Sequence, residues 1–278
     1  MESLSTIPDW IALEHKVAQL LTEQELHGWY FDEDAARELA SSLYSELEAL
    51  KTVLRNRYPY VAGREFTPKR VNRTLGYVEG APCTKLIEFS PTSRDHIAWV
   101  MENLHGWIPD KQTKAGKTAI DEVVLKEIGT EESLQFFRCL ELTKHLGMLS
   151  EGNNAWLKLV RDNRIHHHCS VSTNTSRCAH RNPNLAQVPS GSEFRKLFRA
   201  TPGYVMVGAD LAGIELRLLA HYLARYDGGR YGDILLNGDI HQENADKIGI
   251  SRRLVKTVTY AFLYGAGDKK IEIGRAHV

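Results

Sequence analysis

The most informative stretch of the sequence is RRLVKTVTYAFLYG, residues 252–265. Four of its side chains recur at every fourth position: Arg252, Lys256, Tyr260 and Tyr264. Because four residues make slightly more than one turn of an α-helix, these side chains share one slowly drifting face of a predicted helix. Cationic groups followed by aromatic rings suit a ligand that carries phosphates, a sugar and a base. Basic residues on a helix are more often simply solvated, but Val255, Val258 and Phe262 supply a separate apolar face for packing.

A second informative stretch is DLAGIELR, residues 210–217, which follows a predicted strand at residues 204–209. The strand carries Asp210 to the edge of a sheet, where its carboxylate can bind a cation without being buried. A turn or a helix N-cap is the more common role of an aspartate in this position. Glu215, taken alone, is a solvated carboxylate in the first turn of a helix.

The composition is ordinary for a globular protein. Hydrophobic residues make up 42% of the 278 residues, and 35 basic residues balance 35 acidic ones. This balance argues against a small DNA-coating protein, although an enzyme can keep its positive charge local. No apolar run approaches the ~18 residues of a membrane span, and the first residues do not form a signal peptide. We therefore expect no membrane partner and a cytoplasmic location. The four cysteines form no CxxC pair and are expected to be reduced thiols.

The first two thirds of the chain predict helices. They are expected at residues 10–27, from Asp32 onward, at 93–105 and at 131–145. Gly28 ends the first helix, and Gly147 lies just beyond the last. The helix that Asp32 caps is long and has leucines along one side, which suits packing against a partner helix. Residues 55–90 are rich in glycine and proline and predict an irregular connection.

The sequence pattern changes near Arg164. Strands are expected at 164–173 and 204–209, then a helix at 214–226, short helices around Asp233 and His241, and a helix at 251–263. Helices therefore come first, a mixed sheet follows, and helices return. This order predicts an α+β fold.

The two informative stretches resemble motifs of a known family. Residues 210–217 resemble the first metal-binding motif in the palm of family A DNA polymerases. Residues 252–265 are similar to the nucleotide-binding helix of the fingers in that family, which has the pattern RxxxKxxxYxxxYG. The resemblance runs from about Trp10 to Ile271, with the motifs in the expected order and spacing.

Two further segments carry the same resemblance. TSR (residues 175–177) and NPNLAQVP (residues 182–189) are similar to the stretch that grips the primer-template. NGDIH, residues 237–241, fits the phage branch of the family.

The resemblance implies a right-hand polymerase fragment with an α+β fold. It has a helical thumb, part of an antiparallel-sheet palm and part of the helical fingers. The implied segments are a lead-in at 1–31, the thumb at 32–163, the first part of the palm at 164–230 and the first part of the fingers at 231–272. No exonuclease domain is expected within residues 1–278, because the sequence holds no paired-carboxylate exonuclease motif.

The resemblance also implies roles for individual residues. Asp210 and the backbone carbonyl of Leu211 hold Mg²⁺, of which the complete enzyme uses two ions. The residues that bind the triphosphate and offset its charge are Arg252, Lys256 and His241, and the first two are catalytic together with Asp210. Tyr260 stacks beside the sugar and base. Glu215 occupies the space of a ribose 2′-hydroxyl and excludes ribonucleotides, and Tyr264 abuts it.

A separate group of residues is implied to contact the primer-template backbone and minor groove: Arg177, Asn184, Gln187 and Arg195. These contacts position DNA rather than read its sequence. The partners implied for the chain are therefore primer-template DNA and deoxynucleoside triphosphates (dNTPs).

The sequence departs from the family pattern in three places. The downstream His-Asp-Glu motif, which carries the second metal-binding carboxylate, is absent, so we expect this fragment to be inactive alone. Residues 273–278 are interpreted as a non-native tail, because the end of the chain, EIGRAHV at residues 272–278, back-translates into a common sequencing-adapter sequence. The stretch at 55–90 is short, which argues against a thioredoxin-like processivity factor.

Other interpretations remain open. The main alternative is a non-catalytic module that binds primer-template DNA, from a split or decayed polymerase gene. A cellular repair polymerase of the same family is disfavoured by residues 237–241. A zinc site formed by His166, His167 and His168 with Cys169, Cys178 and His180 is also disfavoured, because adjacent residues of a strand point to opposite faces, so the three histidines cannot share one ion.

Overall fold

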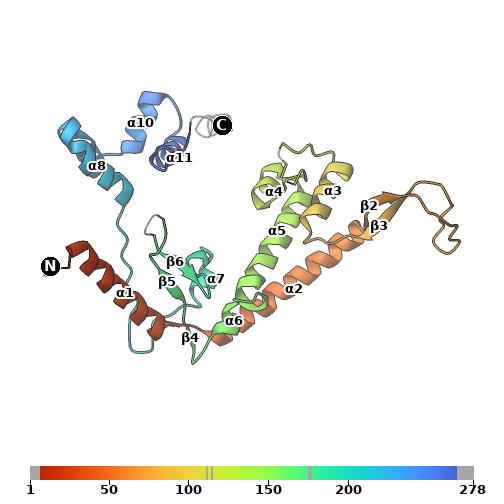
Figure 1. Ribbon diagram of the computed structural model, residues 1–278, viewed down its shortest axis with the longest axis horizontal. Coiled ribbons are helices and arrows are strands. Elements are labelled where there is room, and N and C mark those ends of the chain that lie inside the picture. Colours follow the sequence, from red (N-terminus) through yellow and green to blue (C-terminus); the bar gives the residue numbers. More distant parts are fainter. Residues whose placement is uncertain (1–6, 111, 114, 175–176, 268–278) are drawn as a thin grey trace, which may run out of the picture. The chain divides into compact units, whose positions relative to one another are not determined.

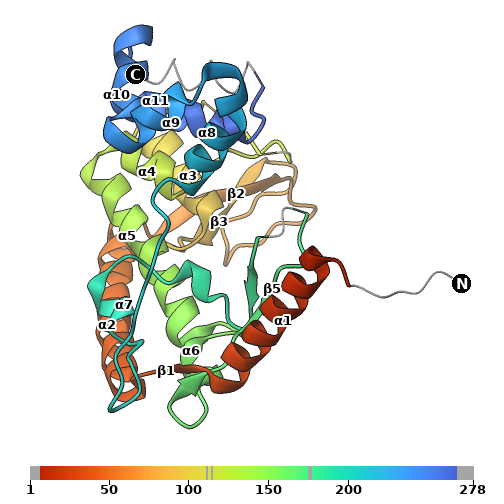
Figure 2. The ribbon, with the colours of Figure 1, turned by 90° about the vertical axis from the view of Figure 1, so that its left-hand side faces the viewer.

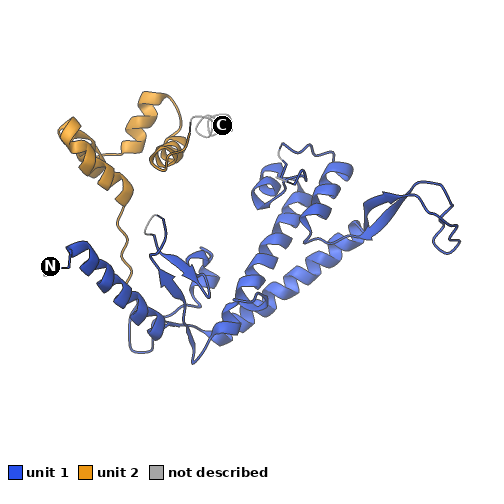
Figure 3. Ribbon diagram, viewed as in Figure 1, with its two compact units in different colours: residues 1–206 blue, residues 207–278 orange. Residues whose placement is uncertain are grey.

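A computed structural model describes residues 7–110, 112–113, 115–174 and 177–267 of the chain. Two compact units, residues 1–206 and 207–278, are described separately below (Figure 3). Helices dominate both, and the first unit also holds three two-stranded antiparallel sheets, which confirms the predicted α+β class. The bounds of the thumb, palm and fingers stay a prediction. The interpretation of the tail at 273–278 lies outside the described residues.

The longest element of the first unit is α2 (Glu33–Arg57), which lies along α5 (Glu131–Leu146) (Figure 1). Asp32 caps α2 as predicted, because its carboxylate accepts a hydrogen bond from the Ala35 amide at 3.0 Å. The predicted leucine stripe is the packing face: Leu43, Leu47 and Leu54 are buried, and Ala36 is buried as well. A helix-period apolar pattern therefore fixes this pairing.

Three shorter helices accompany the pair: α3 (Arg94–Leu104), α4 (Glu122–Ile128) and α6 (Trp156–Leu159). Sequence reasoning did not identify α4, although Asp121 caps it and accepts hydrogen bonds from the amides of Val123 and Val124. The helical path also continues past Gly147, through the π-helical turn η1 (Gly147–Glu151). Leu149 is fully buried in this turn, so packing outweighs the low helix propensity of glycine.

The connection at residues 55–90 is not irregular throughout, contrary to the prediction. Strand β2 (Tyr60–Phe66) pairs antiparallel with β3 (Cys83–Glu88), and Tyr60 lies opposite Glu88. Of the two strands only Val61 is buried. The alternation of apolar and polar residues that identifies a half-buried strand is therefore missing from the sequence.

The lead-in helix α1 (Asp9–His27) ends at Gly28, as predicted. Gly28 has a φ of +66°, and a Cβ there would lie 2.8 Å from the His166 ring, so both backbone and space require glycine. Beyond it, β1 (Trp29–Tyr30) pairs with β4 (Arg164–Ile165). Strand β5 (His168–Ser170) pairs with β6 (Ala179–Arg181), and α1 runs beside β5 (Figure 2). The strand predicted at 164–173 is thus two short strands.

Aromatic rings join these sheets to the helical pair. Phe31 packs edge-on against Trp156, with ring centroids 6.2 Å apart, and against Phe198 at 5.2 Å. Phe194, on α7 (Ser192–Arg195), packs on the same tryptophan at 6.4 Å. Edge-to-face contacts of this kind add to the burial energy of the rings. They hold the segment after β6, including the 3₁₀ turn η2 (Leu185–Gln187), on the core.

Residues 204–209 do not form a strand, contrary to the prediction. Their apolar side chains are exposed, to 83% for Val205 and 85% for Val207. A strand needs a neighbour that completes its backbone hydrogen bonds, and in the described part of the chain no strand pairs with this segment. Strand propensity is present here, but a pairing partner is not.

The second unit consists of four described helices: α8 (Ile214–Asp227), α9 (Arg230–Asn237), α10 (Ile240–Ile248) and α11 (Arg252–Leu263). These confirm the helices predicted there, and Ser251 caps α11 through the Leu254 amide at 3.3 Å. The expected packing face of α11 is only partly packed. Val255 is buried, but Phe262 is 70% exposed.

Candidate functional site

A cavity of about 360 Å³ opens in the second unit beside α8, α10 and α11. Four residues singled out from the sequence line it: His241, Arg252, Lys256 and Tyr260. Three of them come from one face of α11, because a spacing of four residues places them one turn apart. The structure therefore brings together four of the six residues predicted to bind a nucleotide; Glu215 and Tyr264 do not line the cavity.

Arg252 is held in place by Asp239, which sequence reasoning assigned no role. The Asp239 carboxylate caps α10 by accepting hydrogen bonds from the amides of His241 and Gln242, both at 3.1 Å. Its other oxygen accepts a hydrogen bond from Arg252 Nε at 2.7 Å. The Arg252 guanidinium, helped by the amides, holds the pKa of Asp239 below its usual value. One carboxylate thus orders both a helix start and the guanidinium in the cavity.

His241 is the buried titratable group of the cavity, with 8% of its surface exposed. Burial lowers the pKa of His241, and the positive charge of Arg252 lowers it further. Its Nδ1 atom is buried and has no hydrogen-bond partner among the described residues. Its ring lies 6.1 Å from that of Tyr260, at an angle of 45°. An anion in the cavity would supply the partner that this ring lacks.

Lys256 follows Arg252 by one helical turn and is exposed. In the described part of the chain, no hydrogen bond or ion pair engages its ammonium group. The cavity therefore contains one guanidinium that is ordered and one ammonium that is available to an anion. Arg217 also lines the cavity and donates a hydrogen bond to the Ala212 carbonyl at 2.8 Å. The sequence signal that could have identified Arg217 as a site residue is its position within the DLAGIELR motif.

Glu215 and Tyr264 meet, as predicted from the resemblance. The Tyr264 hydroxyl donates a hydrogen bond to Glu215 Oε1 at 3.0 Å. The contact joins the first turn of α8 to the residue after α11, which are far apart in the sequence. It ties the two informative stretches of the sequence together.

Asp210 and Leu211 lie just before α8, in an exposed segment without regular structure. Neither residue is among those that line the cavity, whereas the next two, Ala212 and Gly213, are. No hydrogen bond or ion pair within the described residues engages the Asp210 carboxylate. An exposed carboxylate beside a backbone carbonyl is a pair of hard oxygen donors of the kind that Mg²⁺ prefers.

The residues predicted to contact DNA lie in the first unit, along the chain from β6 to α7. Asn184 caps η2, because its side-chain oxygen accepts a hydrogen bond from the Ala186 amide at 3.1 Å. Gln187 ends η2, and Arg195 ends α7 with its side chain exposed. Arg177 precedes β6, and its carbonyl accepts a hydrogen bond from the Thr173 hydroxyl at 2.9 Å.

Comparisons with known proteins agree with the motifs. The family model for DNA polymerase family A matches residues 70–273. The DNA-directed DNA polymerases of Escherichia phage T7 and Enterobacteria phage T3 are 33% and 34% identical to the chain over 331 residues. Each match covers 94% of this chain and 46% of the relative, so the chain spans about half the length of these curated relatives.

The fold also matches a solved structure, the POL domain of Pol1 from M. smegmatis in complex with DNA primer-template and dNTP. The TM-score is 0.65 at 18% identity, and the match covers 95% of this chain and 46% of that one. The chain thus combines an α+β fold with a cavity whose cationic and aromatic side chains are the groups that a nucleotide-binding protein needs. The chain belongs to DNA polymerase family A.

No helix within the described residues combines the length and the apolar character that crossing a bilayer requires.

Proposed function

We propose that this chain is part of a DNA-directed DNA polymerase that extends a primer 3′-hydroxyl with dNTPs in phage-type replication, in the host cytoplasm. The observation that carries the proposal is the cavity, where His241, Arg252, Lys256 and Tyr260 meet. These are the residue types that a triphosphate and its sugar require. The T7 and T3 relatives, both DNA-directed DNA polymerases, support the same activity.

The cationic residues would bind the triphosphate. Asp239 presents the Arg252 guanidinium to the cavity, and Lys256 adds a mobile positive charge one turn away. His241 would donate a hydrogen bond to a phosphate oxygen from its unpartnered ring nitrogen. These groups would offset the negative charge that develops on the phosphates during phosphoryl transfer.

The aromatic and acidic residues would define the sugar. Tyr260 lies one turn beyond Lys256 and would pack beside the sugar and base. Glu215, held by Tyr264, would occupy the position of a ribose 2′-hydroxyl and so favour deoxynucleotides. A carboxylate fixed by a hydrogen bond excludes a hydroxyl more sharply than a mobile one does.

Asp210 and the Leu211 carbonyl would hold Mg²⁺, whose oxygen preference they fit. When bound, Mg²⁺ polarises the α-phosphate and stabilises the charge of the leaving pyrophosphate. The role of Arg177, Asn184, Gln187 and Arg195 would be to hold the primer-template. A thioredoxin-like partner forms no part of the proposal.

Primer extension tests the proposal. The assay compares these 278 residues with a polypeptide extended through the His-Asp-Glu motif, on a primed template with Mg²⁺ and dNTPs. We expect extension only from the longer protein, and its loss in Asp210→Asn. If the longer protein binds primer-template but never extends it, the alternative of a non-catalytic binding module is correct.

A further inference from the structure

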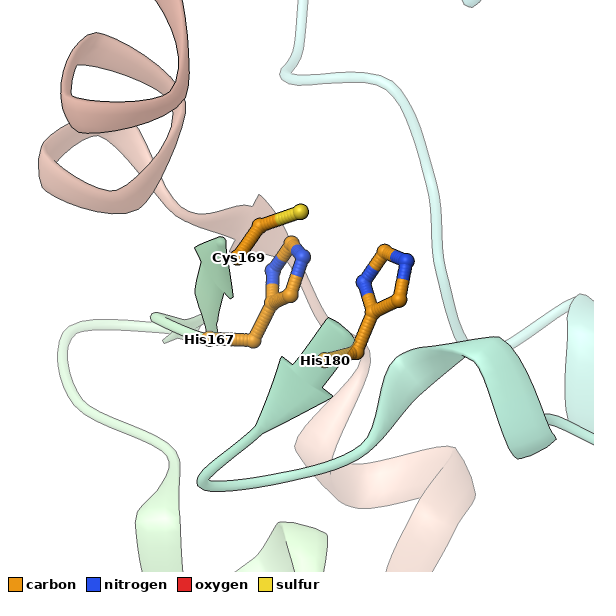
Figure 4. A group of neighbouring side chains, drawn as sticks. All are labelled: His167, Cys169 and His180. Carbon is orange, nitrogen blue, oxygen red and sulfur yellow. The ribbon is translucent and has the colours of Figure 1, made fainter. Parts of the chain in front are cut away.

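The hairpin of β5 and β6 brings three potential metal ligands together, and a fourth, Cys178, lies at its end. Cys169 lies directly opposite His180 in the antiparallel register. His167 precedes Cys169 by two residues, which puts it on the same side as Cys169 and His180, whereas Cys178 precedes His180 by two residues just outside β6. The ligand atoms of His167, Cys169 and His180 lie within 4.8 Å of one another (Figure 4). Cys178 lies close enough to Cys169 to help raise the pKa of its thiol.

The neighbouring histidines are excluded from this face. His166 Nδ1 donates to the Glu25 carbonyl oxygen at 2.8 Å, and His168 Nδ1 pairs with the Glu25 carboxylate at 2.8 Å. Both therefore face α1 instead. Side chains alternate along a strand, so three adjacent histidines cannot share one ion. The same alternation places His167 on the side of Cys169, and the sequence argument against zinc overlooked this pairing.

Two unpartnered nitrogens mark the cluster as a ligand site. His167 is 2% exposed, and its ring stacks on that of His180 with centroids 5.3 Å apart. The Nδ1 atoms of both rings are buried and have no hydrogen-bond partner among the described residues. A buried polar atom without a partner costs free energy, so two neighbouring rings that each hold such an atom call for a further partner.

Burial disfavours the charged forms of His167 and Cys169. Burial lowers the pKa of His167, and the neighbouring His180 lowers it further. Burial, together with Cys178, raises the pKa of the Cys169 thiol to about 11. Neutral imidazole is the form that binds a metal, whereas each thiol releases its proton on binding.

We propose that His167, Cys169, Cys178 and His180 form a tetrahedral Zn²⁺ site. Two thiolates and two imidazoles are the ligand set of structural zinc sites. Bond lengths of about 2.0–2.3 Å set tetrahedral ligand atoms roughly 3.3–3.8 Å apart, so the observed spacing needs to contract by about 1 Å. Cys178 is exposed at the end of the hairpin and can turn inward.

Gln24 completes the arrangement from α1. Its side-chain amide lies 3.4 Å from His167 Nε2, so it can orient the ring while Nδ1 faces the ion. The zinc would fasten the two strands of the hairpin next to Arg177 and ahead of Asn184. It would thus fix the segment predicted to grip DNA, but the site itself does not depend on the proposed function.

Metal content and cobalt spectroscopy test the proposal on the 278-residue chain. Protein purified under reducing conditions should contain one Zn²⁺ per chain by mass spectrometry of the metal. Replacement by Co²⁺ should give the visible bands of tetrahedral cobalt and a near-ultraviolet thiolate-to-cobalt band. A protein that takes up neither metal stoichiometrically would overturn the proposal, as would cobalt bound without the thiolate band.

Paired cysteine variants locate the site. Cys178→Ser changes an exposed side chain, so the fold should persist, which circular dichroism verifies. It should lower Zn²⁺ affinity at least about 100-fold, since loss of an outer partner alone costs about 10–100-fold. Cys83→Ser, in β3, should leave affinity unchanged. Equal affinity in Cys178→Ser and the native chain would refute the site, and so would a Cys169–Cys178 disulfide whose reduction yields no metal binding.

Discussion

The two compact units of the chain differ in how they are packed. The first buries whole aromatic and leucine side chains along α2 and α5, among them Phe31, Leu54 and Phe136 at 0% exposure. In the described part of the second unit, the buried apolar residues are Leu216, Ala220, Ile240, Ala245 and Val255. The unit that carries the predicted catalytic residues therefore has the thinner core.

The difference shows that a sequence can form a binding face without forming a large packed core beneath it. The second unit keeps its cavity through polar contacts, namely those of Asp239 with Arg252 and of Tyr264 with Glu215. Burial of apolar surface, which contributes a free energy of ~25 cal/mol per Å², stabilises the first unit. Regions that must move around a ligand are commonly the less stable parts of a protein.

The largest expected effect is in hydrogen exchange. Amides in the middle of α8 and α11 should exchange at least about 100-fold faster than those in α5, which corresponds to an opening free energy roughly 3 kcal/mol lower. The cause is the small number of buried side chains in the second unit. Mass spectrometry measures the exchange. Equal protection in both units would contradict the inference that the second unit is less stably packed.

A second test concerns the available ammonium of Lys256. Lys256→Ala should weaken dNTP binding about 10- to 100-fold, because a hydrogen bond to a charged group contributes about 1.5–3 kcal/mol. Lys247→Ala is the matched control, since Lys247 pairs with Glu243 at 3.5 Å and does not line the cavity. Calorimetric titration measures both, and equal losses would mean that the cavity is not the binding site.

A third test uses pH. The pKa of His241 is lowered in the empty cavity, and bound phosphates should raise it, so binding takes up a proton. Affinity should therefore rise as pH falls from 8 to 6, by up to about tenfold for each unit by which binding raises the pKa. In His241→Gln, the part of the pH dependence of affinity that comes from His241 should vanish. The effects of Asp239, Arg252 and Lys256 on affinity should remain. Identical slopes would contradict the assignment.

The smallest effects are the coupling energies of single polar pairs. Double-mutant cycles of Glu215→Gln with Tyr264→Phe, and of Glu46→Gln with Arg138→Met, should each give about 0.2–1 kcal/mol. Arg138 bonds Glu46 at 2.7 and 2.9 Å across α2 and α5, but both side chains are more than a third exposed. Urea unfolding measures the cycles, and a coupling above about 2 kcal/mol would mean that these exposed pairs are not screened.

The Glu46 pair also has a pH signature. Its hydrogen bond to Arg138 lowers the pKa of Glu46 below 4.5. The coupling should therefore be complete above that value and disappear as pH falls through the lowered pKa. Persistence of the coupling at lower pH would show that the contact does not depend on charge.

Local patterns were enough to predict much of the fold. The cap at Asp32, the stop at Gly28 and the leucine stripe of α2 each follow from a few neighbouring residues. The helix at 252–263 follows likewise from a repeat of four. These elements confirm that helix signals are local.

The remaining features depend on residues distant in the sequence. Strand β2 needs β3, whose register no periodicity indicates, and residues 204–209 have a strand pattern but no pairing strand among the described residues. In the site, the spacing predicted Arg252 and Lys256, but the contact of Asp239 with Arg252 needs the fold. The cluster around His167 depends likewise on the register of β5 with β6.

The open segment at residues 204–207 has a consequence for how the chain behaves in solution. It exposes the side chains of Tyr204, Val205 and Val207, and the backbone amides of Val205 and Val207 make no hydrogen bond within the described residues, so a second strand can add there. The formal net charge is zero, so long-range repulsion does little to keep copies apart. Self-association of the chain should therefore begin at this segment, and a charged side chain at Val205 is where solubility would be gained.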